Sequence, residues 1–159
     1  MTKKLIIIGA GMAAGRMLEH LYDGGQDWDV TLFNAEPRGT YNRIMLSPVL
    51  SGDKTYAEIE THDAAWYEDH ERVVAVDRAA RTVTAENGNV LEYDKLVFAT
   101  GSTPFIIPLP GHDLDGVIAY RDLEDTERMM ALGEGRKAVV IGGGLLGLEA
   151  AAGMAARGV

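Results

Sequence analysis

Apolar runs and a segment of helical periodicity alternate at the start of the chain, which predicts a parallel sheet covered by helices. Residues 5–8 are continuously apolar, as in a strand buried on both faces. Residues 12–22 carry apolar side chains at helical spacing, and the glycines at 24–25 end the pattern. Residues 30–33 are a second predicted strand, so residues 5–33 are predicted to form a strand–helix–strand unit.

Three short segments in the middle of the chain predict an antiparallel meander. Residues 73–77, 82–86 and 90–93 have the length and composition of strands. Between the last two, Asn87 and Gly88 favour a two-residue hairpin turn. We expect this meander to be a structural insertion in the α/β fold.

Two short helices are predicted before the meander. Ser47 is a suitable N-cap, Pro48 suits the first helical position, and Gly52 is a plausible end. Residues 64–67 predict a second short helix, whose Trp and Tyr we expect to anchor the core.

After the meander, residues 95–100 predict another buried parallel strand, and the proline-containing residues 105–111 predict a stiff connector. Asp122 is a good N-cap for a helix that runs to Leu132, with Gly133 just beyond its end.

The first strand runs directly into the pattern Gly9-x-Gly11-x-x-Ala14, which is a dinucleotide-binding fingerprint. Gly9 permits the tight turn, Gly11 lets a pyrophosphate approach the backbone, and Ala14 keeps the helix close to the strand. The phosphates would lie at the helix N-terminus, against unpaired N–H groups and the positive end of the helix dipole.

An acidic residue follows the second strand, where such a fold binds the adenosine ribose. Glu36 lies 25 positions beyond Gly11, and we predict that its carboxylate binds this ribose. Asn34 is the alternative residue for that role. A solvated loop carboxylate before Pro37 is the structural alternative for Glu36.

The last segment repeats the first. Residues 137–141 predict a strand, and Gly142-x-Gly144-x-x-Gly147 follows as a second fingerprint that leads into a helix. Two fingerprints in one chain are much harder to obtain by chance than one.

Composition narrows the classes of function. The chain has 159 residues, a formal net charge of −9 and no cysteine. The acidic charge argues against nucleic acid and anionic membranes as partners, and no apolar run approaches the roughly 20 residues that span a bilayer. Without cysteine, these residues have no disulfide or thiolate chemistry. We expect a cytoplasmic protein with no metal site, in which the four histidines are solvated; these are His20, His62, His70 and His112.

A secretory signal is a rival interpretation of the first residues, because two lysines, an apolar run and small residues also form that pattern. The second strand and Glu36 at dinucleotide-fold spacing favour the fingerprint.

The fingerprint together with Tyr41-Asn42-Arg43-Ile-Met-Leu-Ser-Pro-Val-Leu-Ser-Gly resembles the N-terminal FAD-binding region of pyridine-nucleotide-dependent flavoprotein reductases. Within that superfamily it is most similar to the large subunit of assimilatory NAD(P)H nitrite reductase. The disulfide-reductase branch carries a redox Cys pair here, and the NADH oxidase and peroxidase branch a single Cys. This chain has neither, which favours reductases that pass electrons from flavin to another centre.

The resemblance implies a truncated Rossmann-like FAD/NAD(P)-binding α/β fold and a set of binding residues. Ala-Thr100-Gly101-Ser-x-Pro resembles the segment that closes over the FAD near its pyrophosphate. The implied FAD-binding residues are Gly9, Gly11, Ala14, Glu36, Arg43, Thr100 and Gly101, and the implied NAD(P)H-binding residues are Gly142, Gly144 and Gly147. From composition alone, Arg43 is as well explained as a surface charge.

The same resemblance implies three parts: an FAD-binding domain over residues 1–110, a linker with a helix over 111–136, and the start of an NAD(P)H-binding domain over 137–159. We therefore expect a fragment, inactive alone, of an enzyme that reduces nitrite to ammonia in nitrate assimilation. Sirohaem and an iron–sulfur cluster would lie in the missing part. No residue here is a convincing catalytic acid, base or nucleophile.

Two alternatives stay open: a ferredoxin- or rubredoxin-type reductase, and a non-catalytic nucleotide-binding module. The sequence does not specify the electron acceptor or the choice between NADH and NADPH. We also expect either homo-oligomers through exposed strand edges or a poorly docked second segment, because residues 95–99 and 138–141 are apolar strands that would lack neighbours.

Overall fold

The computed structural model describes residues 2–25, 27–62 and 71–159. The chain forms two compact units, of which the first comprises Met1–Tyr41 with Glu60–Gly101 and the second Asn42–Ile59 with Ser102–Val159. The predicted helix over residues 64–67 lies outside the described residues, as does His70.

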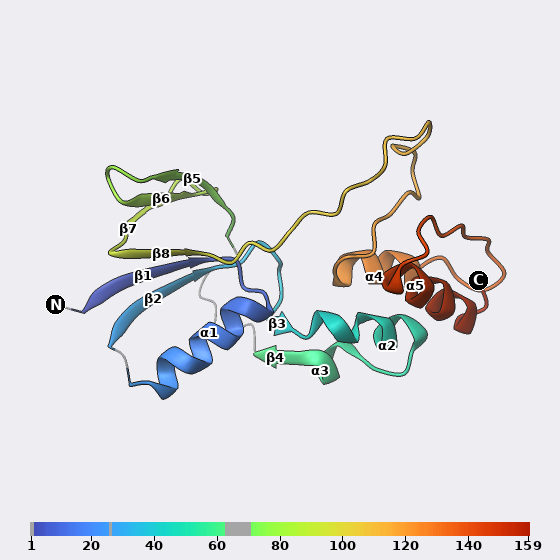
Figure 1. Cartoon of the computed structure of the whole chain (residues 1–159), viewed down its shortest axis with the longest axis horizontal. Helices are drawn as coiled ribbons and strands as arrows, with labels where there is room; N and C mark the ends of the chain where they lie inside the picture. Colours follow the sequence, from blue (N-terminus) through green and yellow to red (C-terminus); the bar gives the residue numbers. More distant parts are fainter. Residues whose placement is uncertain (1, 26, 63–70) are drawn as a thin grey trace. The chain divides into compact units, whose positions relative to one another are not determined.

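A parallel sheet lies at the centre of the first unit (Figure 1). Its strands are β1 (Lys3–Ile8), β2 (Trp28–Phe33) and β8 (Lys95–Phe98), in the order β2-β1-β8. Helix α1 (Met12–Asp23) covers one face, and the antiparallel sheet β5-β6-β7 covers the other. The predicted strand–helix–strand unit, the third parallel strand and the meander are therefore confirmed. The expected burial of the third strand was wrong, because β8 lies at the edge of the sheet and is only partly buried.

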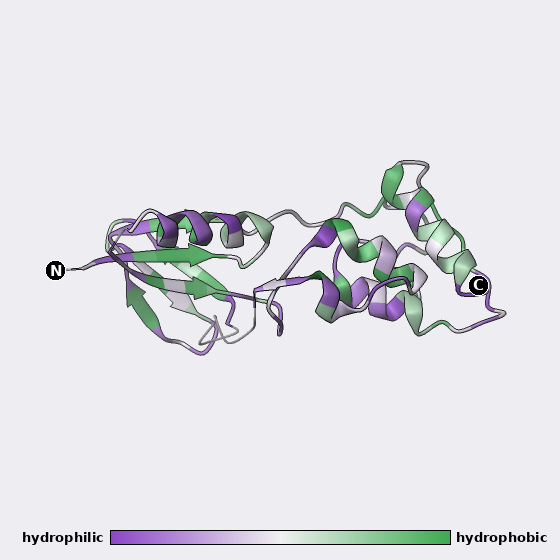
Figure 2. Ribbon diagram, turned by 90° about the horizontal axis from the view of Figure 1, so that it is seen from below, coloured by the Kyte–Doolittle hydropathy of each residue, from purple (hydrophilic) through white to green (hydrophobic). Residues whose placement is uncertain are grey.

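Strand β1 is buried on both faces, as its continuous apolar run predicts. Leu5 and Ile7 pack with Ala14 of α1 on one face. Ile6 and Ile8 pack with the meander on the other face. Each fully buried aliphatic side chain contributes about 1.5–3 kcal/mol, so the four buried residues of this strand contribute substantially to the stability of the unit. Figure 2 shows the corresponding apolar strands beneath the more polar outer face of α1.

The meander has the predicted strands but a different turn. Its strands are β5 (Val73–Asp77), β6 (Thr82–Ala85) and β7 (Val90–Glu92). The Ala85 N–H donates to the Asn89 carbonyl at 2.8 Å, which leaves three loop residues rather than the two that Asn87-Gly88 predicts. Gly88 has φ of +90° and its N–H donates to the Ala85 carbonyl. The loop is therefore a turn followed by a left-handed glycine, which is the next most common hairpin connection.

A second strand pair joins the first unit without any prediction from the sequence. Strand β3 (Thr40–Tyr41) pairs antiparallel with β4 (Glu60–His62). His62, which we expected to be solvated, has a side chain only 10% exposed, and its Nε2 lies 3.3 Å from Glu19 Oε1. That expectation was wrong because strands of two and three residues leave no periodic pattern in the sequence.

The second unit is helical. It contains the 3-10 helix η1 (Arg43–Met45) and the helices α2 (Leu46–Ser51), α3 (Tyr56–Ile59), α4 (Leu123–Met130) and α5 (Leu145–Ala156). Leu50, Met129 and Met154 form its core. Asp122 caps α4 as predicted, accepting the Asp125 N–H at 2.9 Å, although α4 ends two residues before Leu132.

Helix α2 begins earlier than predicted. Its N-cap is Met45, so Ser47 lies inside the first turn and does not cap the helix. Gly52 ends the helix as expected, with φ of +91°. Ser47 instead directs its hydroxyl group to another helix, as described below.

The predicted strand over residues 137–141 is not formed. Among the described residues no strand pairs with it, and Val139 and Ile141 are 88% and 73% exposed. An apolar run becomes a strand only when neighbouring strands satisfy its backbone groups.

Within the part of the chain that the structure describes, no helix is long and apolar enough to cross a bilayer.

Candidate functional site

The first fingerprint turn depends on Gly9 for two reasons. Its φ is +103°, which L side chains rarely adopt. A Cβ atom on Gly9 would also lie 2.4 Å from the Ala99 carbonyl oxygen. The Gly9 N–H donates to the Phe33 carbonyl at 2.9 Å, so the turn lies against the ends of both β2 and β8.

Neither a positive φ nor a steric contact within the described residues explains the glycine at position 11. It is the N-cap of α1, with φ of −78° and ψ of −176°, a conformation open to any residue. No heavy atom of the described residues lies within 4 Å of the position that its Cβ would take. Close approach of a ligand to the backbone explains a glycine here, which fits the pyrophosphate of a dinucleotide.

Two contacts hold this turn in place. Ala14 is buried between α1 and the sheet, as the fingerprint predicts. The Thr40 hydroxyl donates to the Ala10 carbonyl at 3.0 Å in the interior. The sequence does not signal Thr40, because the two residues are 30 positions apart and β3 is only two residues long.

The Ala-Thr-Gly segment lies beside the fingerprint. Besides the Ala99 carbonyl, the Thr100 Cα would lie 3.0 Å from a Cβ on Gly9. Thr100 is exposed and Gly101 follows with φ of +70°. The structure therefore brings together two of the segments that the sequence predicts to bind FAD.

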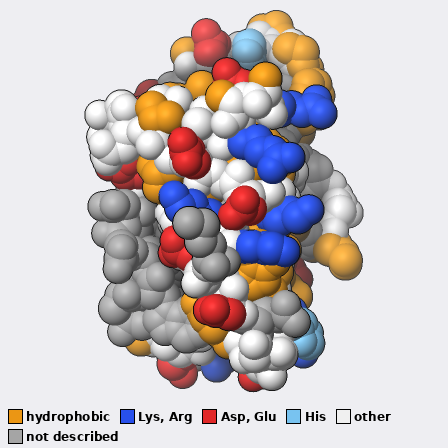
Figure 3. Space-filling model, turned by 90° about the vertical axis from the view of Figure 1, so that its left-hand side faces the viewer, with side chains coloured by type: hydrophobic (Ala, Val, Ile, Leu, Met, Phe, Trp, Pro, Cys, Tyr) orange, Lys and Arg blue, Asp and Glu red, His pale blue; other side chains and the backbone are white. Residues whose placement is uncertain are grey.

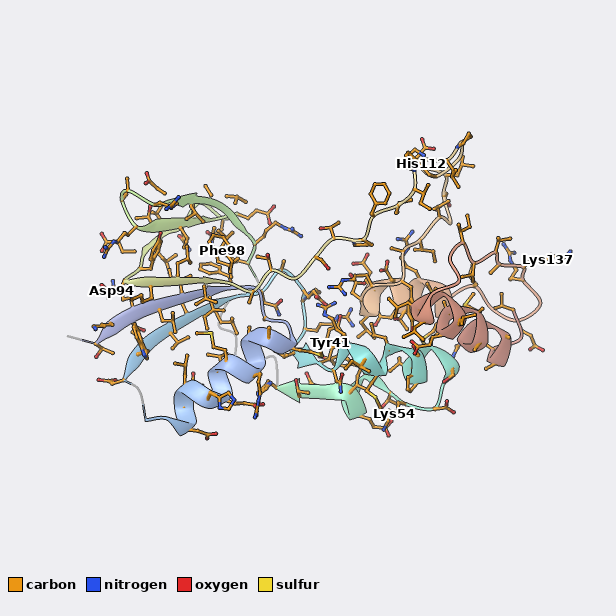
Figure 4. All side chains as sticks on the ribbon, viewed as in Figure 1. Tyr41, Lys54, Asp94, Phe98, His112 and Lys137 are labelled. Atoms are coloured by element: carbon orange, nitrogen blue, oxygen red, sulfur yellow. The ribbon has the colours of Figure 1, made fainter. Side chains whose placement is uncertain are left out.

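Glu36 follows β2, as predicted, and its carboxylate has a defined direction. Its Oε2 accepts a hydrogen bond of 2.8 Å from the hydroxyl of Tyr41, a buried residue of β3 labelled in Figure 4. Asn34 has a structural task instead: it is buried, its amide donates to the Arg38 carbonyl, and its Oδ1 accepts the Glu36 N–H. Of the two, Asn34 holds the loop itself, and the ribose role of Glu36 stays a prediction.

Arg43 belongs to the second unit, where it is the first residue of η1. The Asn42 side chain caps this turn by accepting the Ile44 N–H at 3.1 Å. Arg43 is half-buried.

The second fingerprint repeats the local geometry of the first. Gly142 has φ of +131°, as Gly9 has a positive φ. Gly144 is the N-cap of α5 with φ of −77° and ψ of 177°, and space around its Cβ position is open among the described residues. A Cβ on Gly147 would lie 2.0 Å from the Gly142 carbonyl oxygen, so the third position must be glycine.

Two glycines matter in ways that the sequence does not single out. A Cβ on Gly15 would lie 3.2 Å from the His62 ring, so Gly15 lets the β3-β4 pair approach α1. A Cβ on Gly153 would lie 2.8 Å from Leu50 Cγ, so Gly153 lets α5 approach α2. Close approach between elements far apart in sequence leaves no local pattern.

Two charged side chains of helix α1 pair with each other. Arg16 donates a hydrogen bond to Glu19 and holds the pKa of that carboxyl below its usual range. Within the described ranges, no three His, Asp or Glu side chains gather as a metal ion would require. Basic and acidic side chains are interspersed on the face drawn in Figure 3. The two turns offer backbone N–H groups, so the arrangement is suited to binding and orienting anionic ligands.

Comparison with known proteins agrees with this geometry. A family model described as pyridine nucleotide-disulphide oxidoreductase matches residues 3–159. The nitrite reductase [NAD(P)H] of Bacillus subtilis is 45% identical over 96% of this chain and 20% of the relative. The nitrite reductase (NADH) large subunit of Escherichia coli K12 is 36% identical over 98% of this chain and 20% of the relative. The chain thus spans about a fifth of the length of these curated relatives.

Solved structures give the same fold. The NADH:rubredoxin oxidoreductase from Clostridium acetobutylicum superimposes with a TM-score of 0.81 and 28% identity, over 99% of this chain and 43% of that one. A ferredoxin reductase from Rhodopseudomonas palustris superimposes with a TM-score of 0.84 and 28% identity, over 99% of this chain and 41% of that one.

Proposed function

The chain belongs to the pyridine nucleotide-disulphide oxidoreductase family, and we propose that its first unit binds FAD in an NAD(P)H-dependent flavoprotein reductase. One observation carries the proposal: both glycine turns have a positive φ at the first glycine and a helix N-cap at the second glycine that is open to a ligand. The first turn would bind the FAD pyrophosphate and the second the pyrophosphate of NAD(P)H.

Each binding residue would have a separate task. The open space at Gly11 fits a pyrophosphate, Glu36 would bind the adenosine ribose, and Arg43 would add a cation. Thr100 and Gly101 would close over the cofactor with a hydroxyl group and an unhindered backbone. Bound FAD would supply the hydride chemistry, while these residues bind and orient it. The full proposed set is Gly9, Gly11, Ala14, Glu36, Arg43, Thr100 and Gly101 for FAD, and Gly142, Gly144 and Gly147 for NAD(P)H.

The whole protein would pass electrons from NAD(P)H through FAD to a further centre, for reduction of nitrite to ammonia in nitrate assimilation. Identity to the Bacillus subtilis nitrite reductase supports this choice. Sirohaem and an iron–sulfur cluster would be held outside these 159 residues. The division into 1–110, 111–136 and 137–159 belongs to the same proposal, as does a cytoplasmic location.

A ferredoxin-type reductase is the second candidate. A curated ferredoxin–NAD(+) reductase component from Paraburkholderia xenovorans is 33% identical over 95% of this chain and 39% of the relative, a lower identity over a larger share of the relative. The encoding gene, read past the codon for Val159, separates the candidates. A later cysteine cluster supports the nitrite reductase, and a short extension without one supports the ferredoxin-type enzyme.

Flavin binding is tested by titrating the chain with FAD and following flavin fluorescence. Gly11→Ala should greatly weaken binding without loss of stability, because its backbone and surroundings accept Ala. Gly143→Ala is the matched control, since its Cβ also meets open space among the described residues. No saturable change at high micromolar FAD in the unaltered chain would refute the proposal. Binding of adenine nucleotides without flavin would instead support a non-catalytic module.

A further inference from the structure

Helix α5, which follows the second fingerprint, has one charged side chain. Its sequence is Leu-Leu-Gly-Leu-Glu-Ala-Ala-Ala-Gly-Met-Ala-Ala, in which Glu149 is the sole residue with a polar side chain. Leu145, Leu146 and Leu148 are exposed, while Ala150 and Met154 are buried. Because apolar residues surround the helix on all sides, hydrophobic burial alone does not select one face of α5 for packing.

A hydrogen bond from α2 favours one face of α5. The Ser47 hydroxyl of α2 donates to Glu149 Oε2 at 2.5 Å. The Tyr120 hydroxyl donates to Ser47 Oγ at 3.1 Å. Ser47 thus accepts one hydrogen bond and donates another, which orients its single proton toward the carboxylate. Side-chain hydrogen bonds to a charged acceptor are stronger than neutral ones.

Tyr120 is itself held in place. It lies two residues before Asp122, the N-cap of α4, and the Arg121 N–H between them donates to Asp125 Oδ2 at 2.8 Å. Burial raises the pKa of Tyr120 above its usual value, so its hydroxyl stays protonated and remains a donor at neutral pH. The chain of hydrogen bonds therefore starts at Tyr120, just before α4, and ends at Glu149 of α5.

We propose that Ser47, held by Tyr120, is a positioning residue that fixes the rotation of α5 through Glu149 and so directs the N-terminal amides of that helix toward a pyridine nucleotide. This inference rests on the proposed function of the second fingerprint. It links α2, which follows Arg43, to the helix that begins at Gly144, and all of these elements belong to the second unit.

The test compares Ser47→Ala with a matched serine of the same helix. Ser51 donates to the Pro48 carbonyl and to Asp53 rather than to α5, so Ser51→Ala is the control. Ser47→Ala should speed amide exchange in residues 148–156 about threefold to tenfold, the range expected for one partly solvated hydrogen bond. Ser47→Thr should restore the slow exchange, and Tyr120→Phe should have a smaller effect in the same direction.

A double-mutant cycle with Glu149→Ala isolates the contact. Ser47→Ala should have almost no further effect on exchange in a Glu149→Ala background, whereas Ser51→Ala should be additive. Additive effects of Ser47→Ala, or equal effects of both serine variants, would overturn the proposal.

Titration with NADH separates positioning from stability alone. If the wild-type chain binds NADH, Ser47→Ala should weaken binding severalfold at a temperature where it remains folded, Ser47→Thr should recover it, and FAD affinity should not change. Unchanged NADH affinity in Ser47→Ala would overturn the positioning role. If the wild-type chain binds no NADH, residues 137–159 do not form a pyridine-nucleotide site by themselves, and the exchange data and the cycle still decide whether Ser47 fixes α5.

Discussion

Thr40 donates a hydrogen bond of 3.0 Å to the carbonyl oxygen of Ala10, and both groups are buried. The bond ties the first glycine turn to a strand that begins 30 residues later. The Ala10 carbonyl lies between the two fingerprint glycines, so its orientation sets the orientation of the turn.

Thr40→Val should destabilise the protein by about 1–3 kcal/mol, because it leaves a buried carbonyl without this donor. FAD affinity should fall as well, since the turn loses its anchor. Urea denaturation and flavin titration measure the two effects. Thr61→Val is the control, because the Thr61 hydroxyl donates to the Thr40 carbonyl and not to the turn. The anchoring role is wrong if both variants lose FAD affinity equally.

Gly9→Ala should destabilise the first unit by at least about 2 kcal/mol. The positive φ alone costs an alanine roughly 1–2 kcal/mol, and the contact with the Ala99 carbonyl adds to that. The midpoint of urea unfolding measures the loss. Gly11→Ala in the same turn should leave the midpoint almost unchanged, and a similar shift in both variants would contradict this account of the turn.

Arg43→Ala should weaken FAD binding at least about tenfold, because it removes a charge-assisted hydrogen bond of about 1.5–3 kcal/mol. Arg38→Ala, at a neighbouring arginine before β3, is the control. Titration with FAD, followed by flavin fluorescence, measures the affinity of both variants. Small and equal effects would mean that Arg43 is a surface charge, the alternative that composition leaves open.

Asp125→Asn should stabilise the second unit at neutral pH. Burial raises the pKa of Asp125 above its ordinary value of 3.8, so the folded state binds this proton more tightly than the unfolded state does. The resulting stability is present below pH 3.8 and is lost as the pH rises through the folded pKa. The Asn variant, whose amide oxygen can still accept the Arg121 N–H, should therefore gain on the wild type as the pH rises from 3 to 7. A stability difference that does not change over this range would contradict the prediction.

Self-association through strand edges stays a prediction. Strand β8 is an outer strand that ends at Phe98, labelled in Figure 4 and 65% exposed. Residues 137–141 have no strand partner among the described residues. Exposed apolar edges pair readily, and the net charge opposes this weakly because salt screens it beyond about 8 Å.

Light scattering over a dilution series should show oligomers that Phe98→Lys or Val139→Lys reduces. Leu114→Lys, at an exposed leucine that lies outside the strands, is the control. A compact monomer with strongly protected amides over residues 138–157 would refute the prediction.

Local sequence patterns determined much of this protein. The apolar run that became β1, the cap at Asp122 and the glycine spacing of both fingerprints are each read within about ten residues. They succeed because helix capping and a left-handed turn depend on neighbours in sequence, and because the apolar run of β1 has two neighbouring strands to pair with. For the same reason, the third parallel strand and the meander could be predicted.

Only the tertiary structure decided the contacts that hold the site. The bonds from Thr40 to Ala10 and from Ser47 to Glu149 join residues 30 and 102 positions apart, and neither has a local signal. Residues 137–141, which do not form the predicted strand, show the same dependence on tertiary structure. The apolar pattern of these residues favours a strand. A strand also requires a neighbouring strand whose N–H and C=O groups bond to its backbone, and the fold decides whether one is present.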